Sequence, residues 1–184
     1  MLADLFETIM VGVDGDAVSQ PAFDKALMLA QVTQAKLLIV HVLSSTDADN
    51  PQPAYGYAAL DAITVSAVLQ DQYAQAWTNY RRRYEQLLAQ KVEMAKSLGV
   101  KAESIQADGM AGTALCKLAR QHGVDLLVVG SHRRRGLSEL LVGSTSNYIT
   151  HHAPCSVLVV YPALEDAQGA EPLTVEKETA SIGV

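Results

Sequence analysis

Two glycine-containing segments have the residue types of a phosphate-binding loop. The first runs from Gly130 to Gly136 after an apolar stretch, and the second, Gly143-Ser144-Thr145-Ser146, opens a helical pattern. The N-terminus of a helix offers unpaired N–H groups and a positive dipole, and glycine lets backbone approach phosphate oxygens closely. The hydroxyls of Ser144, Thr145 and Ser146 add further donors. From the spacing alone, these residues suit equally a phosphate site or an ordinary helix cap with turn glycines.

Asp14 is the second candidate for chemistry, because it directly follows the apolar run from Thr8 to Val13. A carboxylate just beyond a strand end can accept hydrogen bonds from ribose hydroxyls or from an adenine amino group. The alternative is structural: an aspartate beside Gly15 can form a turn or cap the next helix.

Both candidates follow short apolar runs, and such runs alternate with helical patterns along the chain. The runs that predict strands are Thr8 to Val13, Ala35 to Val42, Ala102 to Ala107, Val124 to Val129 and Ser156 to Tyr161. The helical patterns begin near Ser19 and Pro21, continue in a long helix that ends at Gly99, recur from Gly112 to His122, and start again near Ser144.

Strands that are apolar on both faces and separated by helices predict a parallel sheet covered on both sides. The fold class is therefore α/β: a doubly wound, Rossmann-like sheet of five strands in the order 3-2-1-4-5. In such sheets ligands bind beyond the carboxyl ends of the strands where the strand order reverses. Asp14 and Gly130 stand at the ends of the two strands that flank this reversal.

The long helix and its approach divide the middle of the chain. Between Ser44 and Gln70 several prolines, a glycine and polar residues favour a long excursion, with a lid as one interpretation. Beyond it an apolar stripe, interleaved with charged residues that include Lys91, predicts the buried face of a helix. The stripe comprises Tyr73, Trp77, Tyr80, Tyr84, Leu87, Leu88, Met94 and Leu98.

Composition and length limit the class of protein. The 184 residues are 49% hydrophobic and 18% charged, which suits one domain, expected over residues 1–162, followed by an acidic and mobile tail at 163–184. A formal charge of −6 with only 14 Lys and Arg residues argues against nucleic-acid binding. No membrane-spanning run or leader pattern is evident, and Cys116 and Cys155 lack metal-ligand spacing. We expect a soluble cytoplasmic protein.

Common enzyme motifs are missing from the sequence. It contains no G-x4-G-K-[ST] loop, no G-x-G-x-x-G fingerprint and no G-x-S-x-G elbow. Whether the chain is an enzyme stays open at this point, and a binding protein is favoured.

The chain resembles the universal stress protein family from about Thr8 to Tyr161. The resemblance is most specific in Val128-Val129-Gly130-Ser131-His132, Leu140-Leu141-Val142-Gly143-Ser144 and the stretch His152 to Val160. The opening Ile9-Met10-Val11-Gly12-Val13-Asp14-Gly15 and the later Leu38-Ile39-Val40-His41-Val42 are similar as well.

The resemblance implies an adenine-nucleotide site of the pattern G-x2-G-x9-G-[ST]. Gly130, Gly143 and Ser144 keep this spacing, whereas Arg133 occupies the second glycine position, where its side chain can instead bond phosphate. By the same resemblance Asp14 contacts the adenosine part and Val42 and Val129 line the adenine pocket. The full predicted set is Gly12, Asp14, Val42, Val129, Gly130, Arg133, Gly143, Ser144, Thr145 and Ser146, with ATP or another adenine nucleotide, and Mg²⁺ as an optional companion.

Three functions follow as hypotheses. The first is a nucleotide-binding regulatory protein of the stress response that acts on an unidentified protein partner. It would be a homodimer through the last strand, Ser156 to Tyr161, since an apolar edge strand tends to be paired. The second is a nucleotide-free dimeric interaction module, which Arg133 makes credible. The third is a slow ATPase or self-phosphorylating protein that uses Ser144, Thr145 or Ser146.

Overall fold

The predicted alternation of strands and helices is confirmed in the computed structural model, which describes residues 5–15, 19–44, 47, 49–52, 62–131 and 143–161, without the side chains of 62–67. The strands in this part of the chain are β1 (Thr8–Gly12), β2 (Lys36–Leu43), β3 (Ala102–Asp108), β4 (Leu126–Gly130) and β5 (Ser156–Val160). The helices are α1 (Ser19–Thr33), α2 (Ala62–Ser97), α3 (Ala111–Gln121) and α4 (Ser144–His152).

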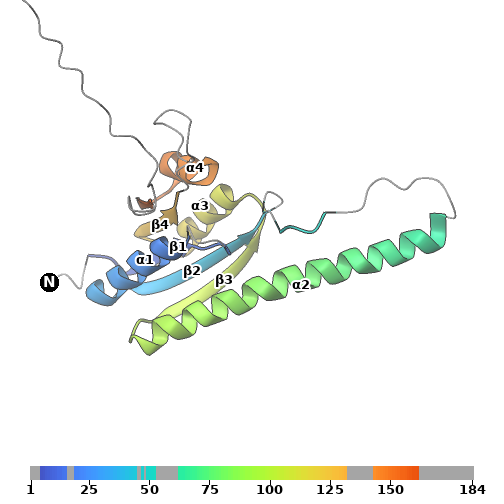
Figure 1. The fold of residues 1–184 in the computed structure, drawn as a ribbon. Coiled ribbons are helices and arrows are strands. Elements are labelled where there is room, and N and C mark those ends of the chain that lie inside the picture. The colour runs from blue at the N-terminus through green and yellow to red at the C-terminus, as the bar shows by residue number, and fades with distance from the viewer. Residues whose placement is uncertain are drawn as a thin grey trace, which may run out of the picture.

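The five strands form one parallel sheet in the order β3-β2-β1-β4-β5, as predicted (Figure 1). Because the chain leaves β1 toward one edge and later crosses to β4 on the other side, the order reverses between these two strands. Their carboxyl ends, at Gly12 and Gly130, therefore lie side by side at the switch point of the sheet.

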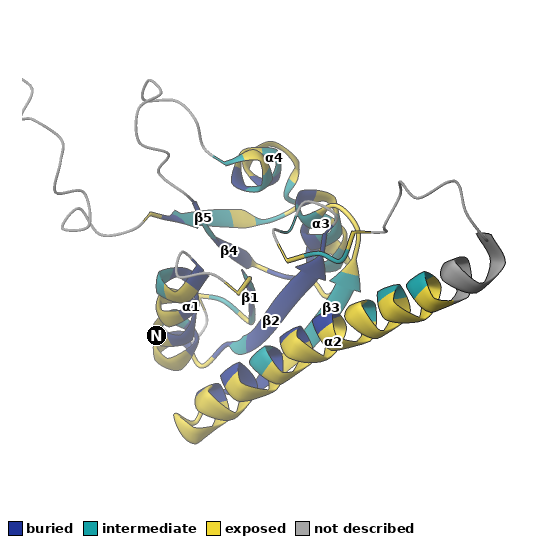
Figure 2. Cartoon of the chain, turned by 45° about the vertical axis from the view of Figure 1, so that its right-hand side comes forward, coloured by how far each residue is buried: buried dark blue, intermediate teal, exposed yellow. Residues whose placement is uncertain are grey.

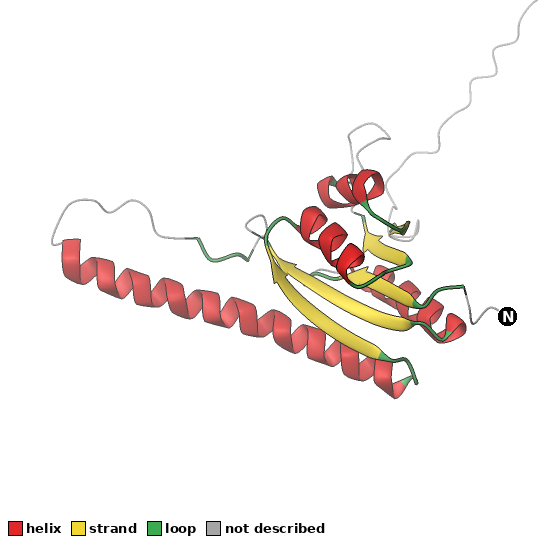
Figure 3. Ribbon diagram, turned by 180° about the vertical axis from the view of Figure 1, so that it is seen from behind, coloured by secondary structure: helices red, strands yellow, loops and turns green. Residues whose placement is uncertain are grey.

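Helices cover both faces of the sheet (Figure 3), and an apolar core fills the space between helices and sheet on each face. Since side chains alternate along a strand, Leu37 and Ile39 of β2 pack with α1 and α2, whereas Leu38 and Val40 pack with α3 and α4. Each core contains fully buried side chains, such as Phe23 on one face of the sheet and Ile149 on the other. This double coverage explains why the strands are apolar on both faces.

Helix α2 differs from the sequence prediction at its start. It begins at Ala62, so residues 62–70, expected to belong to a long excursion, are helical. The β-branched residues Ile63, Thr64 and Val65 weaken the helical signal in this stretch. The remainder of the expected excursion is described only at Ser44, Asp47 and residues 49–52, and the acidic tail lies outside the described residues. In Figure 1 the first part of α2 projects past the carboxyl ends of the strands.

The buried face of α2 also differs in part from the predicted stripe (Figure 2). Tyr80, Tyr84 and Leu88 are buried as expected, but Met94 is 49% exposed. Leu98 is likewise exposed, whereas Lys91, grouped with the charged face in the sequence, is buried. The contact with the sheet follows the line through Leu88, Val92 and Ala95. Met94 directly precedes Ala95, so its side chain points to a different side of the helix.

Gly99 ends α2 as predicted. Its φ of +80° is a left-handed conformation that favours glycine. The N–H of Gly99 donates to the carbonyl of Lys96 at 2.9 Å, and the N–H of Val100 donates to that of Ala95 at 3.0 Å. This pair of bonds is a Schellman motif, which satisfies the last carbonyls of the helix. No helix in the described part of the chain is long and apolar enough to cross a membrane.

Candidate functional site

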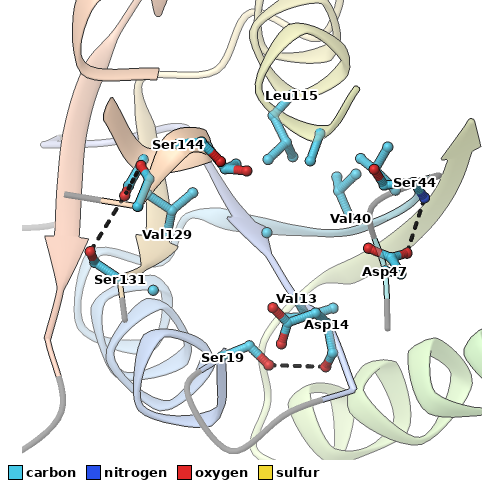
Figure 4. Close-up of a pocket in the computed structure, with 17 residues that line it drawn as sticks. Val13, Asp14, Ser19, Val40, Ser44, Asp47, Leu115, Val129, Ser131 and Ser144 are labelled. Carbon is cyan, nitrogen blue, oxygen red and sulfur yellow. Dashed lines mark hydrogen bonds between the residues drawn. The ribbon is translucent and has the colours of Figure 1, made fainter. Parts of the chain in front are cut away.

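A pocket of about 260 Å³ opens at the switch point of the sheet, where the fold predicts a ligand (Figure 4). This volume is close to the lower end of the roughly 300–1,000 Å³ typical of small-molecule sites. Its lining comes from the carboxyl ends of β1, β2 and β4 and from the first turns of α1, α3 and α4. Segments far apart in the sequence thus meet at one place.

Every predicted contact residue that the structure describes lines this pocket. These residues are Gly12, Asp14, Val42, Val129, Gly130, Gly143, Ser144, Thr145 and Ser146. Arg133 lies outside the described residues. The structure therefore brings the predicted set together in space, and the role of these residues as nucleotide contacts stays a prediction.

The first turn of α4 forms one end of the pocket. Gly143 is the N-cap residue, and no side chain of the described residues caps this helix, so Ser144 is not the helix cap that the alternative to a phosphate site required. Ser144 and Thr145 make no hydrogen bond to the described residues, which leaves their hydroxyls free to meet a ligand. The helix N-terminus with these two hydroxyls suits an anion such as phosphate.

Ser146 has a different role from its two neighbours, because its hydroxyl is used within the protein. Its Oγ donates to the carbonyl oxygen of Gly143 at 3.0 Å and lies 3.4 Å from the Oγ of Ser131. Both serines are almost completely buried, at 2% and 1% exposure. They join the first turn of α4 to the end of β4, where the N–H of Ser131 also donates to the carbonyl of Val160 at 2.9 Å.

Asp14 lies across the pocket from α4, in the turn between β1 and α1 (Figure 4). The hydroxyl of Ser19, at the start of α1, donates to the backbone carbonyl of Asp14 at 3.0 Å, which fixes the turn. The side chain of Asp14 is exposed at the pocket. Its carboxylate is thus placed to accept a hydrogen bond from a ligand, although it also has an interaction within the protein.

Lys91 supplies positive charge behind this turn. Its ammonium donates to the Oε1 of Gln20 at 2.8 Å and lies 4.2 Å from the centre of the Phe23 ring. Burial lowers the pKa of Lys91, and the negative charges of Asp24 and Asp14 oppose that change. The buried ammonium therefore attracts the carboxylates of Asp14 and Asp24 from the side of the α1–α2 core.

The middle of the pocket is apolar. Val40 and Val42 of β2, Leu115 of α3 and Val129 of β4 present aliphatic side chains to it. Gly12 keeps the floor open, because a Cβ there would stand 3.1 Å from the Cδ1 of Leu115 and 3.5 Å from the Cγ1 of Val129. Aliphatic walls of this kind accommodate an apolar part of a ligand.

The loop after β2 closes the remaining side with Ser44 and Asp47. The N–H of Ser44 donates to the Oδ2 of Asp47 at 3.0 Å, and the hydroxyl of Tyr80 donates to the same oxygen. The amide of Asn50 donates to the carbonyl of Ser44 at 2.7 Å. Burial and the bond to Asp47 raise the pKa of Tyr80, so the phenol stays protonated and continues to donate.

A second tyrosine of α2 anchors the same loop behind the pocket. The hydroxyl of Tyr84 donates to the carboxylate of Asp49 at 3.0 Å, and Arg83 pairs with that carboxylate at 2.8 Å. The ring of Tyr84 stacks on His41 with 3.7 Å between ring centres. His41 is 1% exposed, and its Nδ1 has no hydrogen-bond partner among the described residues. Burial lowers the pKa of His41, against the opposing charges of Asp47 and Asp49.

Sequence reasoning missed several lining residues. Val40 could have been found from the period of two that places it on the same strand face as Val42. Ser131 directly follows Gly130, and Leu115 lies within the helical pattern predicted from Gly112 to His122. Asp47 had no signal, because only the fold of the loop brings it to the pocket. No group of acidic, histidine or cysteine side chains among the described residues forms a metal site.

Comparisons with known proteins give one consistent result. The family model of the universal stress protein family matches residues 5–161 of this chain. Universal stress protein YxiE of Bacillus subtilis is 29% identical over 157 residues, or 85% of this chain and 99% of YxiE. Universal stress protein A homolog 2 of Coxiella burnetii is 31% identical over 159 residues, or 85% and 96% of the two chains. A solved universal stress protein in complex with cAMP is 29% identical, with a TM-score of 0.55, and the match covers 86% and 99%.

Proposed function

We propose the following function for this chain, which belongs to the universal stress protein family. It is a stress-response regulatory protein and binds an adenine nucleotide in the switch-point pocket. The observation that carries this proposal is the order of groups around the pocket. The N-terminus of α4 with the hydroxyls of Ser144 and Thr145 lies at one end, aliphatic walls follow, and carboxylates lie at the other end. The cAMP complex of a relative that is 29% identical gives independent support for an adenine nucleotide.

In the proposed complex the phosphates bind the first turn of α4. The unpaired N–H groups there, together with the hydroxyls of Ser144 and Thr145, compensate the negative charge of the phosphates. The purine lies between Val42, Leu115 and Val129, and Asp14 accepts hydrogen bonds from the ribose. ATP is the proposed nucleotide, and Mg²⁺ would then be held chiefly by the phosphates, since such ions keep several waters and few protein ligands.

The first experiment asks whether the purified protein carries or binds nucleotide. The protein is denatured and the supernatant is analysed for adenine nucleotide, and a second sample is melted with and without millimolar ATP. Binding to the folded state alone raises the melting temperature. Absence of released nucleotide together with an unchanged melting temperature would remove the proposal and favour a nucleotide-free interaction module.

A charge placed in the proposed phosphate position localises the site. Ser144→Asp puts a carboxylate in the first turn of α4, which favours the helix dipole but repels phosphate. We expect ATP affinity to fall at least about tenfold, or about 1.4 kcal/mol, while thermal stability without ligand is kept. Ser144→Asn is the matched control, because it fills similar space without charge. Equal ATP affinity in the two variants would place the phosphates elsewhere.

We also propose that the protein forms a homodimer through β5. This strand is at the edge of the sheet, pairs with β4 on one side, and has partly buried Val157, Leu158 and Val159. Edge strands of this kind tend to be covered or paired. Sedimentation equilibrium at micromolar concentration should give twice the mass of one chain, and a monomer at that concentration would contradict the dimer.

A further inference from the structure

Asp47 is a lining residue of the pocket outside the G-x2-G-x9-G-[ST] pattern, and its carboxylate is held in a defined orientation. Its Oδ2 accepts from the N–H of Ser44 at 3.0 Å and from the hydroxyl of Tyr80. Figure 4 shows the carboxylate beside Ser44 with its other oxygen turned toward the interior of the pocket. That oxygen, Oδ1, accepts no hydrogen bond from the described residues.

The position of Asp47 decides which part of a ligand it meets. Asp47 and Ser44 follow β2, beyond the aliphatic side chains of Val40 and Val42, whereas the anion-binding turn of α4 follows β4. Strands β2 and β4 are separated by β1 in the sheet. A nucleotide whose phosphates bind α4 therefore extends its base across β1 toward Asp47.

A carboxylate is only an acceptor, so it attracts an N–H group and repels a carbonyl oxygen or lone pair. Tyr80 and Ser44 already occupy the other oxygen, which keeps Oδ1 facing the pocket. The ligand group that contacts Oδ1 must then be a hydrogen-bond donor. On an adenine base, the exocyclic amino group is that donor.

We propose that Asp47 is a specificity-determining residue that accepts a hydrogen bond from the exocyclic amino group of the bound base. This inference rests on the proposed function, because it assigns one end of the same nucleotide site. It gives the pocket a preference for amino-bearing purines through a side chain outside the glycine loop.

The test compares ATP with purine riboside 5′-triphosphate, which carries hydrogen in place of the amino group and is otherwise the same. Both are titrated calorimetrically into the wild-type protein. A site built to bond a donor disfavours the ligand that lacks it, because its own carboxylate is left unpaired. We expect ATP to bind at least about tenfold more tightly than the analogue.

Asp47→Asn is the informative variant. The N–H of Ser44 and the hydroxyl of Tyr80 both need an acceptor, so the amide oxygen of the asparagine takes the place of Oδ2. Its NH₂ group then faces the pocket and the amino group of ATP, donor against donor. The ratio between the two nucleotides should fall to less than about threefold, since the discriminating bond is gone.

Asp49→Asn is the matched control. Asp49 belongs to the same loop and bonds a tyrosine of the same helix, but it does not line the pocket. It should keep the wild-type ratio. Equal binding of both nucleotides by the wild type, or an unchanged ratio in Asp47→Asn, overturns the inference and leaves the proposed function standing. Binding of neither nucleotide by the wild type overturns both.

Discussion

The hydrogen bond between the Tyr80 hydroxyl and the Asp47 carboxylate should contribute measurably to the stability of the folded protein. Tyr80 is 4% exposed, and its hydroxyl donates to the Oδ2 of Asp47. Hydrogen bonds to charged groups contribute about 1.5–3 kcal/mol, and because Asp47 is half-buried we take the lower end, about 1.5 kcal/mol. For a chain of this size that loss lowers the melting temperature by about 3–6 °C.

The substitution Tyr80→Phe removes the hydroxyl and keeps the ring, which packs edge-on against Trp77 and Tyr84. Urea unfolding followed by far-UV circular dichroism should give a free energy of unfolding lower by about 1.5 kcal/mol than wild type. Tyr73→Phe is the control on the same helix, because the Tyr73 hydroxyl bonds none of the described residues. Its effect should stay within about 0.5 kcal/mol.

A double-mutant cycle separates this bond from other effects of the substitutions. Tyr80→Phe, Asp47→Ala and the double variant are compared, and their effects should be non-additive by about 1.5 kcal/mol. Additivity within about 0.5 kcal/mol, the value for independent sites, would refute the reasoning that Tyr80 holds the pocket loop through Asp47.

Two further predictions concern the packing on either side of the sheet. Burial lowers the pKa of His41 in the folded protein from 6.5, so below about pH 6.5 the unfolded chain binds more protons than the folded one. The contribution of neutral His41 to the free energy of unfolding is therefore complete above about pH 6.5 and decreases as the pH falls. His41→Phe should lose this component in urea unfolding across pH 5–8, and an identical pH profile would contradict it. Gly112→Ala should lower the free energy of unfolding by about 1–3 kcal/mol, because its Cβ would stand 2.8 Å from the Cδ1 of Tyr148. In a Tyr148→Ala background the same change should cost less, and equal costs would exclude the clash.

The fold could be predicted because its signals are local and repeated. Short apolar strands such as Leu126–Gly130, each set off by a helix, permit few arrangements other than a parallel sheet with two covered faces. The end of α2 was equally clear, since Gly99 is a strong stop signal. Its start was not, because Ile63, Thr64 and Val65 follow a stretch rich in turn residues, and helix and excursion compete there on nearly equal terms.

The candidate site was predictable only where it follows strand ends. Asp14, Gly130 and Ser144 stand next to elements whose positions the sheet order fixes. Asp47 and Lys91 depend instead on tertiary contacts with Tyr80 and with Phe23, which no spacing in the sequence reveals. A buried lysine on the apolar face of a helix also breaks the usual rule for charged residues, which is why Lys91 was assigned to the wrong face.

The most direct test of the proposed site is an NMR titration of the isotopically labelled protein with ATP, followed through the backbone amides. The largest shift changes should occur in the first turn of α4, Gly143 to Ser146, with further changes at Gly12 to Asp14 and at Val42. This pattern would place the phosphates at the helix N-terminus and the base against β2. An unchanged spectrum at millimolar ATP, or changes confined to residues outside the pocket, would contradict the account.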